Sequence, residues 1–153
     1  MTQAFDASAQ QALLEARAAA ALEQAREAGA DACEVGASVD QGINVSVRMG
    51  EVETVELARD QGIAVTVYVG QRKGSASSSD ASEASIRALV DRALTIARQT
   101  GEDTASGLAD KALMATELPD LKVHHPWQLS TDQAIEMALA CEQAGRGVAG
   151  VAP

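Results

Sequence analysis

Four segments in the first half of the chain alternate apolar and polar residues at every second position, a period typical of half-buried β-strands. They cover residues 33–39, 43–49, 51–59 and 63–69, of which 51–59 alternates most weakly. The short breaks after the segments contain Gly42, Gly50, Gly62 and Gly70. Connections this short cannot cross over to a parallel neighbour, so adjacent strands must be antiparallel. A fifth strand is predicted at 72–78, where serine and glycine lower the strand propensity.

Helical periodicity flanks this strand region on both sides. The first helix is predicted over residues 6–29, and the apolar stripe that it presents comprises Leu14, Ala18, Ala21, Leu22 and Ala25. A second helix is predicted over 80–101, and a third begins near residue 130. Capping boxes open the second and third helices, formed by Asp80 with Glu83 and by Ser130 with Gln133. Each helix therefore has an apolar face with which it can pack.

The order of these elements predicts an α+β fold, an antiparallel β-meander of four to five strands packed with flanking α-helices. Residues 102–127, which include Pro119 and Pro126, are expected to form an irregular connector. We expect one N-terminal α+β domain over residues 1–147, with 148–153 as the start of a linker or of the next element. The second sheet face is only mildly polar, so something outside this sequence could cover it.

The charge balance excludes several functional classes. Twelve basic residues against 22 acidic ones give a formal net charge of −10, which repels nucleic acid and anionic membrane surfaces. No apolar run approaches the roughly 20 residues of a membrane-spanning helix, and the N-terminus lacks the pattern of a secretory signal. Cys33 and Cys141 are isolated from other potential ligands, so we expect reduced thiols and a cytoplasmic location.

No self-sufficient catalytic or metal site is expected. His124 and His125 are the only histidines, and adjacent residues of an extended segment point apart, whereas zinc needs three or four converging ligands. The serines of Gly74–Ser79 lack the Gly-x-Ser-x-Gly pattern of a nucleophile elbow. We therefore predict no catalytic residue, no bound metal and no cofactor in this chain.

Residues near the predicted fifth strand are the best candidates for contact with a substrate or a partner. These candidates are Arg72, Lys73, Gly74 and Ser75. The small residues of the 74–79 stretch would let another chain approach the backbone closely. An anion could also bind where Arg72 and Lys73 precede the second helix, but the Asp80 and Glu83 carboxylates compete for the same N–H donors.

Five stretches in fixed order carry a family resemblance. They are Arg-Met-Gly-Glu-Val-Glu-Thr-Val-Glu at 48–56, Asp-Gln-Gly-Ile-Ala-Val-Thr-Val-Tyr at 60–68, Gln-Arg-Lys-Gly-Ser-Ala-Ser-Ser-Ser-Asp at 71–80, Gly-Leu-Ala-Asp-Lys at 107–111 and His-Pro-Trp at 125–127. Together they resemble the N-terminal domain of a PmbA/TldE-type subunit in the TldD/PmbA metalloprotease family. The resemblance covers most of residues 25–145.

The resemblance implies a cytoplasmic protease assembly in which a PmbA/TldE-type subunit pairs with a TldD-type subunit. Family members mature peptides of the microcin type and degrade unfolded polypeptides. The family's zinc motif, His-Glu-x-x-x-His with a later Cys, belongs to the TldD-type subunit and has no match in this sequence. The implied role is a non-catalytic domain, matching roughly the first third of a subunit, with zinc in the partner. Expected partners are a TldD-type subunit, a second copy of the chain and extended or unfolded peptides.

The sequence also allows a function from a different class. The chain could be a stand-alone cytoplasmic protein-interaction domain that has no link to proteolysis. The sequence that follows Pro153 in the gene would discriminate between the two. A hydrolase that uses Ser75 or Ser77 is a third option, and it predicts reaction with a fluorophosphonate probe.

Overall fold

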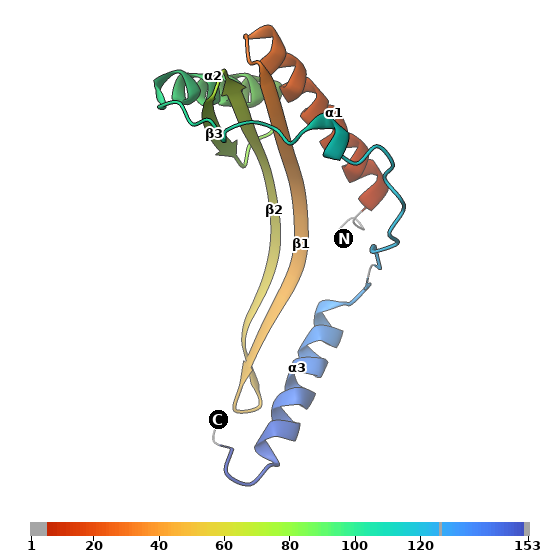
Figure 1. The fold of residues 1–153 in the computed structure, drawn as a ribbon. Coiled ribbons are helices and arrows are strands. Elements are labelled where there is room, and N and C mark those ends of the chain that lie inside the picture. Colours follow the sequence, from red (N-terminus) through yellow and green to blue (C-terminus); the bar gives the residue numbers. More distant parts are fainter. Residues whose placement is uncertain (1–5, 126, 152–153) are drawn as a thin grey trace. The chain divides into compact units, whose positions relative to one another are not determined.

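The computed structural model describes residues 6–125 and 127–151, which form an α+β fold, as predicted. In chain order its elements are α1 (Ala7–Glu27), β1 (Ala32–Arg48), β2 (Glu51–Val69), β3 (Arg72–Ser78), α2 (Glu83–Gln99), the 3₁₀ turn η1 (Lys111–Leu113) and α3 (Thr131–Arg146) (Figure 1). Pro126 of the predicted connector and residues 152 and 153 of the predicted linker lie outside the described residues. No described helix combines the length and the apolar character that crossing a membrane requires.

The sheet of the described chain has three antiparallel strands in the order β1-β2-β3, so the prediction of four to five strands was wrong. Segments 33–39 and 43–49 form one strand, and segments 51–59 and 63–69 form another. The predicted reversals at Gly42 and Gly62 do not occur. Both glycines lie within long strands, and neither adopts the positive φ of a tight turn. The predicted strand at 72–78 is confirmed as β3.

The two hairpin turns occur where positive φ angles are found. Met49 (φ 54°) and Gly50 (φ 85°) both lie in the left-handed region, which identifies a two-residue type I′ turn between β1 and β2. Gly70 (φ 59°) begins the turn between β2 and β3, and its N–H donates to Asp31 Oδ2 at 2.6 Å. Each turn therefore contains a glycine, which adopts a positive φ without the steric cost that Met49 incurs.

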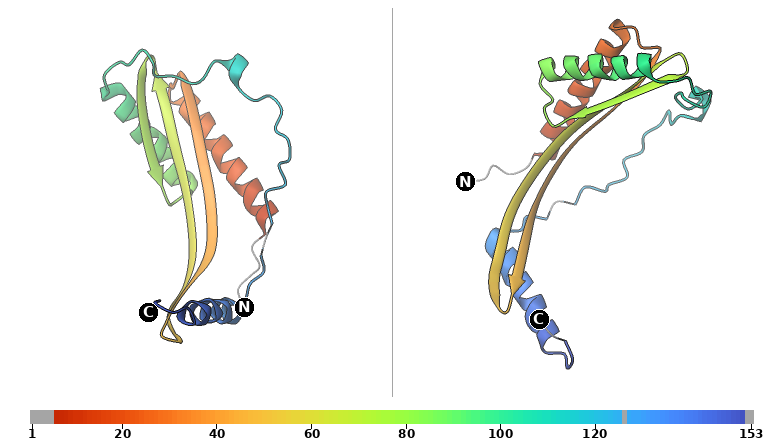
Figure 2. Two further views of the ribbon diagram at one scale, coloured as in Figure 1. Left: turned by 60° about the horizontal axis from the view of Figure 1, so that its bottom comes forward. Right: turned by 90° about the vertical axis from the view of Figure 1, so that its left-hand side faces the viewer.

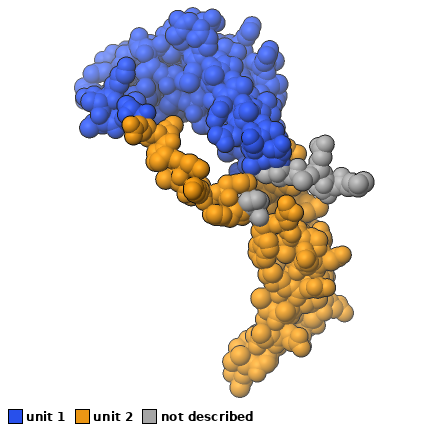
Figure 3. Space-filling model, turned by 90° about the vertical axis from the view of Figure 1, so that its right-hand side faces the viewer, with its two compact units in different colours: residues 1–40, 60–116 blue, residues 41–59, 117–153 orange. Residues whose placement is uncertain are grey.

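The chain divides into two compact units, which Figure 3 distinguishes by colour. Unit 1 comprises residues 1–40 and 60–116, and unit 2 comprises residues 41–59 and 117–153. In unit 1, helices α1 and α2 pack on the same face of the sheet (Figure 2). Its core consists of Ala21, Ala25, Ile63, Val65, Val67, Ala81, Ile86, Leu89, Val90, Ala93, Leu94 and Ala97. Only small residues of α1 contribute to this core, and Leu22 of the predicted stripe is 42% exposed.

The starts of the helices test the predicted caps. The capping box of Ser130 and Gln133 is confirmed at α3, where both reciprocal hydrogen bonds are present. The box predicted at Asp80 and Glu83 is wrong, because α2 begins at Glu83 and its N-cap is Ser82. Asp80 accepts hydrogen bonds from the Ser82 N–H at 2.9 Å and from the Ser82 hydroxyl at 3.1 Å. The carboxylate thus orders the residues just before the helix.

Unit 2 consists of the tip of the β1–β2 hairpin, the end of the connector and α3. A carboxylate from α3 holds the hairpin turn. Glu142 Oε1 accepts from the Met49 N–H at 2.5 Å, and its Oε2 accepts from the Gly50 N–H at 2.7 Å. Two successive N–H groups in a turn of positive φ form a concave donor pair that favours an anionic partner.

Candidate functional site

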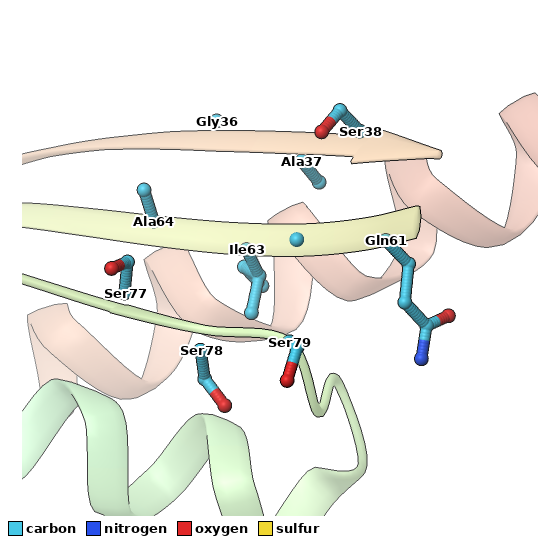
Figure 4. A pocket seen from close by; sticks show the side chains of 10 residues that line it. Gly36, Ala37, Ser38, Gln61, Ile63, Ala64, Ser77, Ser78 and Ser79 are labelled. Carbon is cyan, nitrogen blue, oxygen red and sulfur yellow. The ribbon is translucent and has the colours of Figure 1, made fainter. Parts of the chain in front are cut away.

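An open hollow of about 630 Å³ lies at one end of the unit 1 sheet (Figure 4). Its walls come from residues 36–38 of β1, 61–64 of β2 and 77–79 at the end of β3. Apart from Gln61 and Ile63, every residue that lines the hollow is Gly, Ala or Ser. The backbone is therefore accessible over an area about three strands wide.

Strand alternation determines which side chains reach the open face of the sheet. In the β2–β3 register Ala64 pairs with Ser77 and Ile63 pairs with Ser78. Figure 4 shows Ala64 and Ser77 pointing to one side of the strands, and Ile63 and Ser78 to the other. The open face thus carries short side chains, which would let a flat or extended group approach the sheet closely.

The buried side of the hollow is fixed by the core and by the entry to α2. Ile63 is 1% exposed, and the Ser78 hydroxyl accepts from the Asp80 N–H at 3.0 Å. Hydrogen bonds to Asp80 from the Ser85 hydroxyl, and then from Ser82, lower the pKa of this carboxyl. The floor of the hollow is therefore held by packing and by an ionised carboxylate.

Arg72 lies at the first position of β3, opposite Val69, at the end of the strand remote from the hollow. Its guanidinium donates to Glu102 Oε1 at 3.1 Å, and both side chains are partly exposed. About five residues of strand separate it from Ser77, or roughly 17 Å at the rise of a β-strand. The structure therefore does not bring Arg72 to the hollow.

Lys73 and Ser75 lie on the open face of the sheet, on the same side as Tyr68 and Thr66 of β2. Lys73 is exposed and pairs with Tyr68 across the strands. The Ser75 hydroxyl lies 2.9 Å from the Thr66 hydroxyl, which is a cross-strand hydrogen bond. These two predicted contact residues are the ones that an object on the open face would meet.

Tyr68 contributes an aromatic ring to this part of the open face. It is 6% exposed, and its hydroxyl donates to Glu34 Oε1 at 3.1 Å. Burial raises the pKa of the phenol, and the hydrogen bond and negative charge of Glu34 raise it further. Tyr68 therefore stays a neutral hydrogen-bond donor at physiological pH.

Gly74 faces the helices and not the open face. A Cβ atom at this position would lie 2.1 Å from the Ala93 carbonyl oxygen and 2.4 Å from the Ala97 backbone nitrogen. The close backbone approach predicted at Gly74 is therefore made by α2 of the same chain. Because Ala93 and Ala97 belong to the C-terminal half of α2, the start of β3 lies beneath that half.

This arrangement bears on the anion hypothesis. Arg72 and Lys73 precede Gly74, so they lie toward the C-terminal half of α2 and not at its start. At the start of the helix, the Ser82 hydroxyl accepts from the Ser85 N–H, and Asp80 accepts from the Ser82 N–H. The two cations and the helix N-terminus therefore do not converge on one anion.

Zinc, which the family resemblance implies for the assembly, does not fit the residues of this chain that the structure describes. Residues 6–125 and 127–151 contain no group of three or more His, Cys, Asp or Glu side chains that could hold a metal ion. His124 and His125 lie side by side in the connector, both exposed. Burial raises the pKa of the Cys33 thiol, and Glu34 adds to this effect.

The contribution of β1 and β2 to the hollow was not among the predictions from sequence. Gly36, Ser38, Gly62 and Ala64 recur at alternate positions, which is the signal for a strand face of small residues. A reversal is predicted at Gly62, but the structure places this glycine within β2, next to Ser38. A Cβ atom on Gly62 would lie 3.8 Å from the Ser38 hydroxyl oxygen.

Comparison with known proteins adds a second line of evidence. Residues 33–97 match the family model described as PmbA/TldA metallopeptidase domain 1. A metalloprotease PmbA homolog from Haemophilus influenzae is 47% identical over 124 residues, which cover 81% of this chain and 27% of that protein. Metalloprotease PmbA from Escherichia coli O157:H7 is 48% identical over 136 residues, which cover 89% of this chain and 30% of that protein. The chain thus spans less than a third of the length of these relatives.

Two solved structures share the fold. A candidate modulator of DNA gyrase from Bacteroides thetaiotaomicron superposes with a TM-score of 0.78 at 24% identity, over 89% of this chain and 31% of that one. TldE from Thermococcus kodakarensis gives a TM-score of 0.54 at 15% identity, over 73% of this chain and 23% of that one. At these identities the likeness concerns the fold alone.

Proposed function

This chain belongs to the PmbA/TldD metallopeptidase family, and we propose that it serves there as the non-catalytic N-terminal domain of a PmbA/TldE-type subunit. The observation that carries the proposal is its identity of 47% and 48% to two proteins named as PmbA metalloproteases, over most of its own length. The small part of each relative that it covers supports the role of one domain within a larger subunit.

In this role the domain holds substrate or partner and leaves bond cleavage to other parts of the assembly. The open face of unit 1 suits an extended polypeptide, because short side chains at Ala64 and Ser77 leave the backbone accessible. Lys73 would add a positive charge at the far end of that face. Arg72 would contribute only after leaving Glu102.

The chemistry of the assembly would come from a TldD-type partner subunit that carries the zinc ion. Zinc there would activate water for peptide hydrolysis. The substrates expected from the family are peptides of the microcin type and unfolded polypeptides, handled in the cytoplasm. Within that scheme this domain forms part of the wall that surrounds the substrate.

A binding experiment tests the proposal directly. A tagged form of the chain is mixed with the TldD-type subunit of the same organism, and the complex is measured by interferometry. A fluorescent, unfolded peptide with acidic side chains is titrated in parallel by anisotropy. We expect the complex to form, and we expect Lys73→Glu to weaken binding of an acidic peptide about threefold to tenfold.

The matched control is Lys111→Glu, which makes the same charge change on an exposed residue of η1, outside the sheet. It should leave both affinities within about twofold. A chain that binds neither the subunit nor the peptide would contradict the proposal and favour an interaction domain unrelated to proteolysis.

A further inference from the structure

The β1–β2 hairpin of unit 2 has an open backbone edge along β2. Strand β3 pairs only with residues 63–69 of β2, so residues 51–62 have β1 as their one neighbour in the sheet. Among the described residues, no backbone hydrogen bond outside the helices and the sheet reaches 51–59. We call the side of 51–59 that faces away from β1 the β2 edge. Free edges of this length favour pairing with a further strand.

The type I′ turn fixes which residues point along this edge. In a two-residue hairpin the flanking residues, Arg48 and Glu51, exchange hydrogen bonds with each other. The N–H and C=O groups of the odd-numbered residues after Glu51 therefore point to β1. Those of the even-numbered residues point outward, and these are Val52, Thr54, Glu56 and Ala58.

The sequence of the β2 edge is complementary to itself. When two copies run antiparallel about a two-fold axis at Val55, Glu51 of each copy lies opposite Arg59 of the other. Val52 then lies opposite Ala58 and Thr54 opposite Glu56, so the outward N–H and C=O groups meet in reciprocal pairs. Val55 lies opposite its own copy. No two like charges face each other in this register.

Alternative registers with the same backbone parity are poorer. A shift by two residues in one direction places Glu56 directly opposite its own copy, which is repulsive. A shift by two in the other direction leaves Arg59 opposite the turn residue Met49 and removes both pairs of opposite charge. The charge pattern therefore selects one register.

We propose that the β2 edge, residues 51–59, is a self-association surface through which two copies of this chain pair as antiparallel strands about Val55. The exposed apolar side chains of this stretch agree with such pairing. Leu57 is 69% exposed and Val55 is 41% exposed, on the same strand face. Pairing places Leu57 diagonally next to the second copy's Val55, within contact distance for side chains. This surface is separate from the open face of unit 1 and does not depend on the function proposed above.

The first test measures the oligomeric state of the full 153-residue chain by sedimentation equilibrium. We expect a monomer–dimer equilibrium. Glu51→Arg or Arg59→Glu alone should raise the dissociation constant about tenfold, because each places two like-charge pairs in the dimer. The double variant restores opposite charges and should return to within about threefold of the wild type.

The matched control for this test is Glu53→Arg, which makes the same charge change on the same face but lies opposite Leu57. Its charged neighbour in the second copy is Arg59, which lies in the weaker diagonal position, so the dissociation constant should rise by about threefold or less. A chain that stays monomeric at the highest attainable concentration would overturn the proposal. A double variant that dimerises no better than the single variants would also overturn it. The same holds if this edge binds only foreign peptides and not a second copy of the chain.

The second test reads the register. In a Cys33→Ser, Cys141→Ser background, Val55→Cys should form an intermolecular disulfide on mild oxidation, because the two residues are directly opposed. Glu53→Cys is the control, since its two copies would be offset by four residues, or about 13 Å. Equal cross-linking of both variants would exclude the proposed pairing.

Discussion

Different interactions stabilise the interiors of the two units of this protein. Unit 1 buries complete aliphatic side chains, among them Ile63, Ile86 and Leu94, each at most 2% exposed. In unit 2 Ala134 is the one buried residue among those described, and the contacts that define its hairpin turn come from Glu142. The comparison teaches that apolar burial stabilises one part of the chain, whereas hydrogen bonds to a carboxylate position the other.

The largest expected effect is a loss of stability at the close contact between β3 and α2 in unit 1. Gly74→Ala would place a Cβ atom 2.1 Å from the Ala93 carbonyl oxygen, so α2 must move away from β3. We expect a loss of about 4 kcal/mol in the free energy of unfolding, measured by urea denaturation. Gly36→Ala is the control, because nothing lies within 4 Å of its Cβ position. Equal stability of the two variants would show that α2 is not packed as described.

The next prediction compares how much stability each unit loses when an apolar side chain is shortened to alanine. Leu94→Ala removes a side chain that is 2% exposed and should destabilise unit 1 by about 3 kcal/mol. Met137→Ala on α3 removes one that is 43% exposed and should cost less than about 1 kcal/mol. Hydrogen exchange of α2 and α3 would report each change separately. Similar losses at both sites would mean that unit 2 has a core comparable to that of unit 1.

A smaller effect is expected where a carboxylate holds unit 2. Glu142→Gln keeps the side-chain shape but replaces one acceptor oxygen with a donor, so one of the two turn N–H groups loses its partner. We expect a cost of about 1 kcal/mol. Amide exchange at Met49 and Gly50, followed by NMR, should accelerate while the amides of β3 stay protected. Unchanged exchange at the turn would contradict the role given to Glu142.

The smallest effect concerns the buried polar group of unit 1. The pKa of Tyr68 is raised in the folded state, so its contribution to stability is complete below the unfolded value, about 10, and is lost as pH rises through the folded value. Tyr68 is the one tyrosine of the chain, so near-ultraviolet phenolate absorbance reports its ionisation alone. Tyr68→Phe should remove this component of the alkaline decline. If the Tyr68 phenol titrated at or below the pKa of free tyrosine, this would contradict both its burial and its contact with Glu34.

The predictions from sequence succeeded where a local pattern has one structural solution. The Ser130–Gln133 capping box specifies a helix start on its own, and it is found at α3. The strand count failed because glycine permits a turn without requiring one, so Gly42 and Gly62 could equally lie within long strands. One sign of a continuous β1 was present in the sequence, since Val39 and Ile43 keep the same parity.

The candidate site was predictable only in part. Lys73 and Ser75 lie on the open face, where a contact residue could act, while Arg72 is engaged by Glu102 and Gly74 is covered by α2. The sequence could not distinguish a glycine that admits a ligand from one that admits a helix of the same chain. Both uses require the same absence of a side chain.

The sequence by itself determined the class of fold, the antiparallel order of the strands and the family, because periodicity, short connections and ordered motifs are local properties of the chain. Only the tertiary structure decided which glycines turn, which residue caps α2 and which face of β3 stays open. Those outcomes depend on residues far apart in sequence, such as Glu142 at the Met49 turn and Ala93 above Gly74. Their contacts form only when the chain has folded, so no local pattern encodes them.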